Sequence, residues 1–158
     1  MQTKNEKKQI IMLLEETFSG SHAWHGPTVM QALTGISPET RKARLSKNTH
    51  SITELVAHME AWRNFVIQKL RGVEFEMTDE LNFPKPGPWT KCLSKLKLSQ
   101  SKLIDALHAF PKDNLYKRVP GRKYDFYTLL HGVIQHDIYH TGQISLIKKS
   151  GIRLVINH

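Results

Sequence analysis

The stretch that decides the fold reads HDIYHTGQI and occupies residues 136–144 of the 158-residue chain. It lies within a long run of helical periodicity. At about 100° per residue, one stripe of this helix contains Leu129, Val133, His136, His140, Gln143 and Ile147. Histidines four residues apart lie one above the other on a helix, so both imidazoles can reach a single metal ion. Buried imidazoles without partners are costly, and a shared ion would satisfy both.

The histidine pair also has an ordinary interpretation, in which hydrogen bonds hold both side chains on the surface or in the core. A third histidine in a similar setting favours the metal site. His58 lies about two turns into a helix that begins with a capping box formed by Ser51 and Glu54. The inward stripe of that helix contains Leu55, Met59, Trp62 and Val66. Three imidazoles on two helices would leave coordination positions open for water or substrate, as in a reactive zinc site.

These segments resemble the DinB-like metalloprotein superfamily. The similarity rests on AWHGPTVMQALTGIS at residues 23–37, THSITELVAHMEAW at 49–62 and HGVIQHDIYHTGQI at 131–144, and it extends over nearly the whole chain. The resemblance implies an all-α fold, an antiparallel four-helix bundle with a long crossover connection, and commonly a homodimer. It also implies that the metal ligands are His58, His136 and His140. Characterised members include thiol-dependent S-transferases and an isomerase, so the resemblance leaves the reaction open.

Length and composition agree with this class. A chain of 158 residues is long enough for one domain with a sizeable core, so we expect residues 1–158 to form a single domain. The only cysteine, Cys92, excludes an internal disulfide and a CxxC site, and its place in a helical segment favours packing over a nucleophilic role. The N-terminal segment lacks a signal-peptide pattern and no stretch is long enough to span a bilayer, so we expect a cytoplasmic protein without membrane contact.

The formal net charge of +9 raises the question of nucleic acid. Lysines and arginines are spread over every segment, and the sequence shows no helix-turn-helix, zinc-finger or strand-platform pattern. We therefore expect a solvated basic surface and no nucleic-acid partner. The charge can also attract anionic substrates.

Four long helices are expected, at about residues 5–18, 52–71, 90–110 and 126–151, with inward side chains Ile10, Ile11, Leu13, Leu14 and Phe18 in the first. Short helices are expected to start at Gly26-Pro27 and at Ser37-Pro38. Because metal sites in bundles are built from facing helices, the helix of His58 must neighbour the helix of the histidine pair. Their relative direction remains open. The apolar tail at residues 152–156 is expected to pack on the bundle or on a second copy.

Zinc is the first candidate for the ion and nickel the second, because imidazole suits both; iron and manganese also remain possible. Such an ion would lower the pKa of a bound water or thiol. We therefore expect a metal-dependent enzyme, either a small-thiol-dependent S-transferase or a hydrolase that uses metal-bound water, with a small-molecule substrate such as a low-molecular-weight thiol. Because no clear general base stands beside the ligands, the alternative is a non-catalytic stress-response protein that binds metal or a small ligand.

Three further side chains are candidates for the pocket. Gln143 can orient a metal ligand or line the pocket, although an internal hydrogen bond explains it equally well. Tyr139 lies within one turn of both histidines, where it can also pack at an interface. His25 and Trp24 can form one lip of the pocket or simply pack locally. Asp137 is expected to point away from the histidines and to be exposed.

Overall fold

The computed structural model describes residues 2–150, with side chains from Glu6 onward. This part of the chain is α-helical and contains no β-strand, which confirms the predicted all-α class. Its helices are α1 (Gln2–Ser19), α2 (Val29–Leu33), α3 (Pro38–Lys42), α4 (Ile52–Leu70), α5 (Asp79–Asn82), α6 (Trp89–Ala109), the 3-10 helix η1 (Lys112–Asn114) and α7 (Phe126–Lys149).

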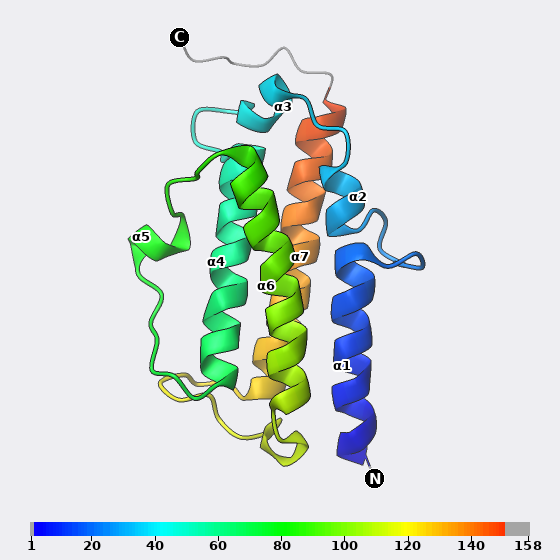
Figure 1. Cartoon of the computed structure of the whole chain (residues 1–158), viewed down its shortest axis with the longest axis vertical. Coiled ribbons are helices and arrows are strands. Elements are labelled where there is room, and N and C mark those ends of the chain that lie inside the picture. The colour runs from blue at the N-terminus through cyan, green and yellow to red at the C-terminus, as the bar shows by residue number, and fades with distance from the viewer. Residues whose placement is uncertain (1, 151–158) are drawn as a thin grey trace.

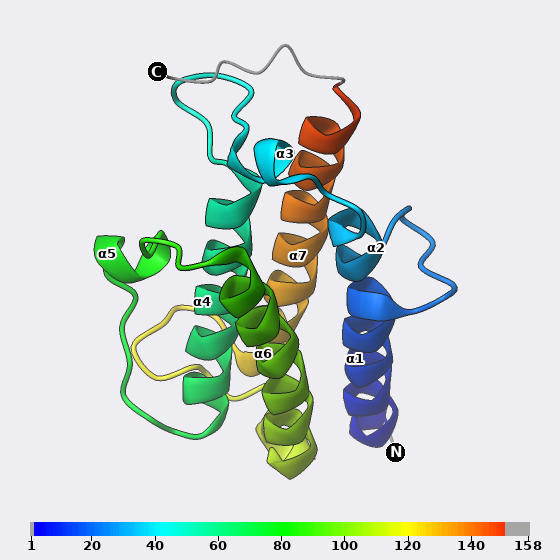
Figure 2. The same ribbon diagram turned by 45° about the horizontal axis from the view of Figure 1, so that its top comes forward.

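Four long helices, α1, α4, α6 and α7, pack side by side (Figure 1). Both α4 and α1 contact α6 and α7. After α4 the chain returns along the outside of the bundle through α5 before α6 begins, so α4 and α6 run in the same direction (Figure 2). This return is a long crossover connection. Since α7 runs opposite to α4, the start of α4 lies level with the later part of α7. That arrangement brings His58 to the height of His136 and His140.

Local capping explains where α4 and α7 begin. The hydroxyl of Ser51 accepts a hydrogen bond from the Glu54 N–H, and the Glu54 carboxylate accepts one from the Ser51 N–H at 2.8 Å. The carboxylate of Asp125 accepts a hydrogen bond from the Thr128 N–H at 2.8 Å and caps α7. The capping box at Ser51 is the one predicted from the sequence, and the Asp125 cap starts α7 at Phe126, where the helical pattern predicts the start.

The short helix α2 begins later than predicted. Its cap is Thr28, whose hydroxyl accepts from the Gln31 N–H, while the Gln31 side chain accepts from the Thr28 N–H at 2.9 Å. This reciprocal capping box satisfies two N–H groups, and Pro27 has no side-chain acceptor with which to do the same. The other short helix, α3, follows the prediction, with Ser37 as its cap and Pro38 in its first turn.

The buried apolar side chains form two clusters, one toward each end of the bundle. Members of the first include Leu14, Phe65, Leu103, Leu107 and Leu130. Members of the second include Phe18, Met59, Leu96 and Ile144. Leu13, predicted to point inward, is 38% exposed, because the buried face of α1 is centred on Ile10 and Leu14 and lies about 80–90° from it.

A buried polar network lies between these clusters. The guanidinium of Arg63 donates hydrogen bonds to the Asp137 carboxylate and to the side-chain oxygen of Gln100, and all three side chains are buried. Gln100 in turn donates to the Leu14 carbonyl at 3.2 Å, and Arg63 lies 4.7 Å above the ring of Phe18. The network therefore connects α4, α6, α7 and α1.

The expected exposure of Asp137 is wrong, since only 1% of its surface is exposed. At about 100° per residue, Asp137 lies at the centre of the buried face of α7, together with Val133, Ile134 and Ile144. A charged residue tolerates that position only because Arg63 reaches it from another helix. Burial raises the pKa of Asp137, and the neighbouring guanidinium limits the rise.

Three other expectations concern a membrane span, the C-terminal tail and the cysteine. No helix within residues 2–150 is long and apolar enough to cross a membrane. The tail at residues 152–156 lies outside the described residues, so its predicted contact and the homodimer stay predictions. Cys92 is buried in α6 and its thiol donates to the Gly87 carbonyl at 3.4 Å, as expected for a packing residue.

Replacing one partner of the buried ion pair should be far worse than replacing both. Arg63→Met leaves the Asp137 carboxylate buried without its cation, and we expect a loss of about 3–5 kcal/mol in the free energy of unfolding. The double variant Arg63→Met/Asp137→Leu should recover much of that loss. Urea unfolding followed by circular dichroism measures both. Additive losses in the double variant would contradict a coupled pair.

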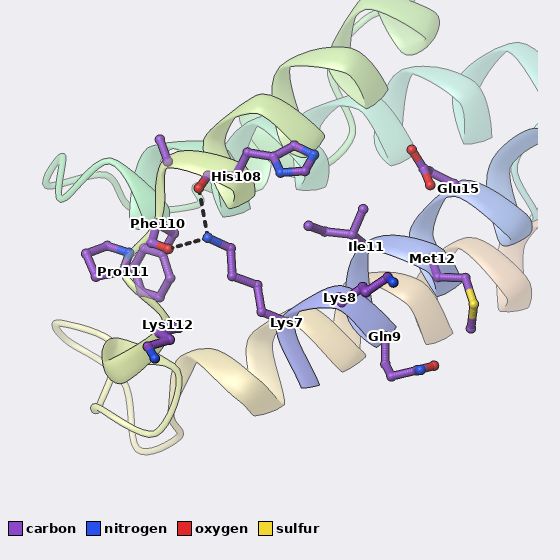
Figure 3. A pocket seen from close by; sticks show the side chains of 11 residues that line it. Lys7, Lys8, Gln9, Ile11, Met12, Glu15, His108, Phe110, Pro111 and Lys112 are labelled. Carbon is purple, nitrogen blue, oxygen red and sulfur yellow. Dashed lines mark hydrogen bonds between the residues drawn. The ribbon is translucent and has the colours of Figure 1, made fainter. Parts of the chain in front are cut away.

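The second stability prediction concerns the end of α6. The ammonium of Lys7 in α1 donates hydrogen bonds to the carbonyls of His108 and Phe110 at 2.8 and 2.7 Å (Figure 3). Carbonyls at a helix C-terminus lack donors within the helix and favour a positive charge. Lys7→Met should therefore lower the free energy of unfolding by about 1 kcal/mol.

The matched control is Lys8→Met, because Lys8 is exposed and lines the same surface pocket as Lys7 (Figure 3). It should change stability by less than about 0.5 kcal/mol, as surface substitutions usually do. Equal effects of the two substitutions, measured by chemical denaturation, would show that the carbonyl contacts of Lys7 contribute nothing.

Candidate metal centre

Three histidine side chains converge between α4 and α7. Nε2 of His136 lies 2.9 Å from Nε2 of His58 and 3.1 Å from Nε2 of His140. One ligand atom from each of the three residues lies within 4.8 Å of the others. His58 comes from α4, and the other two come from successive turns of α7. The structure thus brings together the three residues that the sequence analysis selects.

Hydrogen bonds at the far side of two rings determine which nitrogen carries the hydrogen. Nδ1 of His58 lies 2.6 Å from the Asn82 carbonyl, which can only accept, so Nδ1 is the donor. Nδ1 of His140 lies 2.6 Å from the side-chain oxygen of Gln143 and donates to it in the same way. In the neutral state, both Nε2 atoms therefore direct a lone pair at His136. A single N–H on His136 cannot fully satisfy both, whereas a metal cation can accept all three lone pairs.

The environment keeps the cluster neutral. Burial lowers the pKa of His58 to about 4. Burial and the neighbouring imidazole of His140 lower the pKa of His136 to about 3. Burial also lowers the pKa of His140, although its hydrogen bond with Gln143 opposes the change. Uncharged imidazoles at neutral pH are the form that binds metal ions.

The donor set and its spacing fit a divalent ion. Two nitrogens bound at about 2.0–2.1 Å to one tetrahedral zinc ion lie about 3.3 Å apart. The two separations that involve His136, 2.9 and 3.1 Å, lie within a few tenths of an ångström of that value, and the ligand atoms of all three residues lie within 4.8 Å of one another. The cluster could hold a metal ion through His58, His136 and His140. Three protein ligands would leave coordination positions open on such an ion.

Residues of the crossover connection hold the imidazole of His58 in one orientation. Besides accepting from His58 through its carbonyl, Asn82 accepts a hydrogen bond from the indole N–H of Trp62 at 2.8 Å. The ring of Phe83 is stacked on the His58 imidazole, with centroids 4.0 Å apart. Partners of this kind orient metal ligands and tune their basicity. The end of α5 therefore holds one imidazole in place.

His50 belongs to the same stack, although it is not among the residues predicted from the sequence. Its ring is parallel to the other face of Phe83, with centroids 3.7 Å apart. It is thus separated from His58 by one aromatic ring. No local pattern signals Asn82, Phe83 or His50, because each acts through a contact distant in sequence.

The remaining candidates occupy different places. Gln143 hydrogen-bonds to His140, a contact compatible both with orienting a metal ligand and with an internal hydrogen bond, so its role at the metal stays a prediction. Tyr139 is 63% exposed and lies edge-on to His140, with ring centroids 5.0 Å apart. His25 is exposed in the loop between α1 and α2 and is not brought to the three histidines, so its pocket role stays a prediction. Its neighbour Trp24 is 99% exposed, and local packing does not explain that side chain.

The contact of Gln143 yields a prediction for metal affinity. Gln143→Leu removes the acceptor that holds Nδ1–H of His140, so we expect metal binding to weaken about 10–100-fold. Gln143→Glu keeps an oxygen at this position and should retain the affinity. Competition with a chromophoric chelator measures both. The control is Gln135→Leu on the exposed side of the same helix, which should bind as the unmodified protein does. Unchanged affinity in Gln143→Leu would disprove the orienting role.

Comparison with known proteins agrees with this geometry. A family model described as the DinB superfamily matches residues 23–144, more than half of the chain. The matched range contains all three histidines of the cluster. Neither a search of the curated proteins nor one of the solved structures gave a significant match. The chain therefore belongs to the DinB superfamily, as its histidine-bearing motifs indicated.

Proposed function

We propose that this protein is a metal-dependent S-transferase that joins a small-molecule thiol to an electrophilic substrate. His58, His136 and His140 would hold the divalent ion, with zinc or nickel as the metal. The observation that carries the proposal is the convergence of three neutral imidazoles within 4.8 Å, two of them with their Nε2 lone pairs directed inward by hydrogen bonds. Imidazole ligands suit both metals. When bound, such an ion supplies Lewis acidity, which makes a thiol or a water more acidic.

The chain itself offers no suitable thiol. Cys92 is its only cysteine and is buried in the apolar cluster that includes Leu96. A nucleophilic sulfur would therefore have to come from a second substrate. In the proposed reaction this sulfur forms a bond to an electrophilic carbon, the bond from that carbon to the leaving group breaks, and the thiol proton passes to the solvent.

The protein residues around the cluster have supporting roles in this proposal. Asn82 and Gln143 hold two imidazoles in the orientation that presents Nε2 to the centre. Tyr139 is exposed and lies beside His140 at the surface of the cluster. Its hydroxyl can contact a substrate that binds there. The stacked ring of Phe83 shields one face of His58 from water.

Metal content and activity test the proposal together. The purified protein would be analysed for bound elements and then reconstituted with zinc or nickel. It would next be assayed with cysteine or glutathione against iodoacetamide. Metal-dependent loss of free thiol above the uncatalysed rate is expected. Hydrolysis of 4-nitrophenyl acetate without thiol consumption would favour metal-water hydrolysis instead. Metal binding with no turnover in either assay would favour the alternative, a non-catalytic stress-response protein that binds metal or a small ligand.

Removing one ligand should abolish metal binding without unfolding the bundle. His136→Ala deletes a side chain whose Nδ1 is buried without a hydrogen-bond partner, and the fold is stabilised mainly by apolar burial. We expect less than a tenth of the original metal content with unchanged helical circular dichroism. His131→Ala is the control, since His131 lies on the same helix but packs on Tyr127, with ring centroids 4.4 Å apart. Loss of helix together with the metal would show that the ion is structural.

A further inference from the structure

An apolar groove of about 290 Å³ adjoins the histidine cluster. It lies between α4 and α7 and extends from His136 toward the start of α7. The side chains and backbone that form most of its walls belong to Trp62, Val66, Leu129, Gly132, Val133 and His136. His136 therefore belongs both to the groove and to the cluster, and Trp62 is fixed to the same crossover residue that holds His58.

A glycine forms part of the groove wall. Gly132 lies one helical turn before His136, and a Cβ built there would meet no atom within 4 Å. A glycine inside a helix costs roughly 1 kcal/mol relative to alanine. At this position the missing side chain leaves the groove open beside the imidazole. Larger residues would extend into that space without first meeting the protein.

We infer that this groove binds the apolar, ring-sized part of the electrophilic substrate. The inference rests on the proposed function and specifies its substrate class: electrophiles that carry an aryl or a compact alkyl group. Apolar walls exclude a charged group, because such a group would lose its hydration without gaining partners. The volume lies at the small end of ligand pockets, which suits one ring. With the ring placed there, the reactive carbon of the substrate would lie toward His136 and the open side of the cluster.

Ligand binding tests the groove independently of turnover. The probe is 4-nitrobenzyl alcohol, an unreactive analogue of 4-nitrobenzyl chloride, and isothermal titration calorimetry measures its affinity for the zinc-loaded protein. We expect binding to the unmodified protein and at least tenfold weaker binding to Gly132→Leu, because the leucine side chain occupies the groove. Gly142→Leu is the matched control. It makes the same change in the same helix at an exposed position outside the groove, so affinity should persist.

The activity arm uses two electrophiles of different size. Gly132→Leu should lower the ratio of the rate of thiol transfer to 4-nitrobenzyl chloride over the rate to iodoacetamide at least tenfold, while Gly142→Leu should keep that ratio and the metal content within about twofold of the unmodified protein. Binding of the alcohol that is absent, or equal in both glycine variants, would overturn the inference. If neither electrophile reacts but the alcohol still discriminates between the variants, the groove stands and the transferase proposal fails.

Discussion

The buried ion pair between Arg63 and Asp137 is the constraint on which the site depends. Asp137 lies between His136 and His140 on α7, so the rotation that places its carboxylate against Arg63 also determines where both imidazoles point. A rotation that moved the histidines away from His58 would strip the carboxylate of its cation inside the protein. Such an unpaired buried charge costs several kcal/mol. The pair therefore sets the geometry of the metal centre without belonging to it.

The position of this pair in the core explains why it has such an effect. Arg63, Gln100 and Asp137 lie between two apolar clusters, one toward each end of the bundle. Apolar packing is non-directional, and cores can accommodate alternative packings of similar volume. Hydrogen bonds from one guanidinium to two other helices are directional and allow one register. The polar layer thus complements the stabilisation that the apolar clusters supply.

The crossover connection adds a second, independent constraint. It places the Asn82 carbonyl on one side of the His58 imidazole and the ring of Phe83 on its face. The candidate metal centre is therefore assembled from α4, α7 and the segment between α4 and α6. Partners that fix the tautomer and orientation of a ligand contribute to metal affinity, and losing one typically weakens binding about 10–100-fold. The groove beside Gly132 opens on the other flank of His136, so one imidazole links ligand binding with the cluster.

By itself the sequence determined the helices, the caps at Ser51 and Asp125, and the three histidines, because helical periodicity and capping depend on residues only a few positions apart. It also identified Gln143, one turn from His140. Only the tertiary structure decided the antiparallel pairing of α4 with α7, the burial of Asp137 and the contact between Asn82 and His58. The sequence pattern predicts that a carboxylate is exposed unless a guanidinium from another helix reaches it, and the backbone carbonyl at the end of α5 carries no sequence signal. These contacts join residues 24 to 74 positions apart, and chain topology brings them together where local pattern cannot.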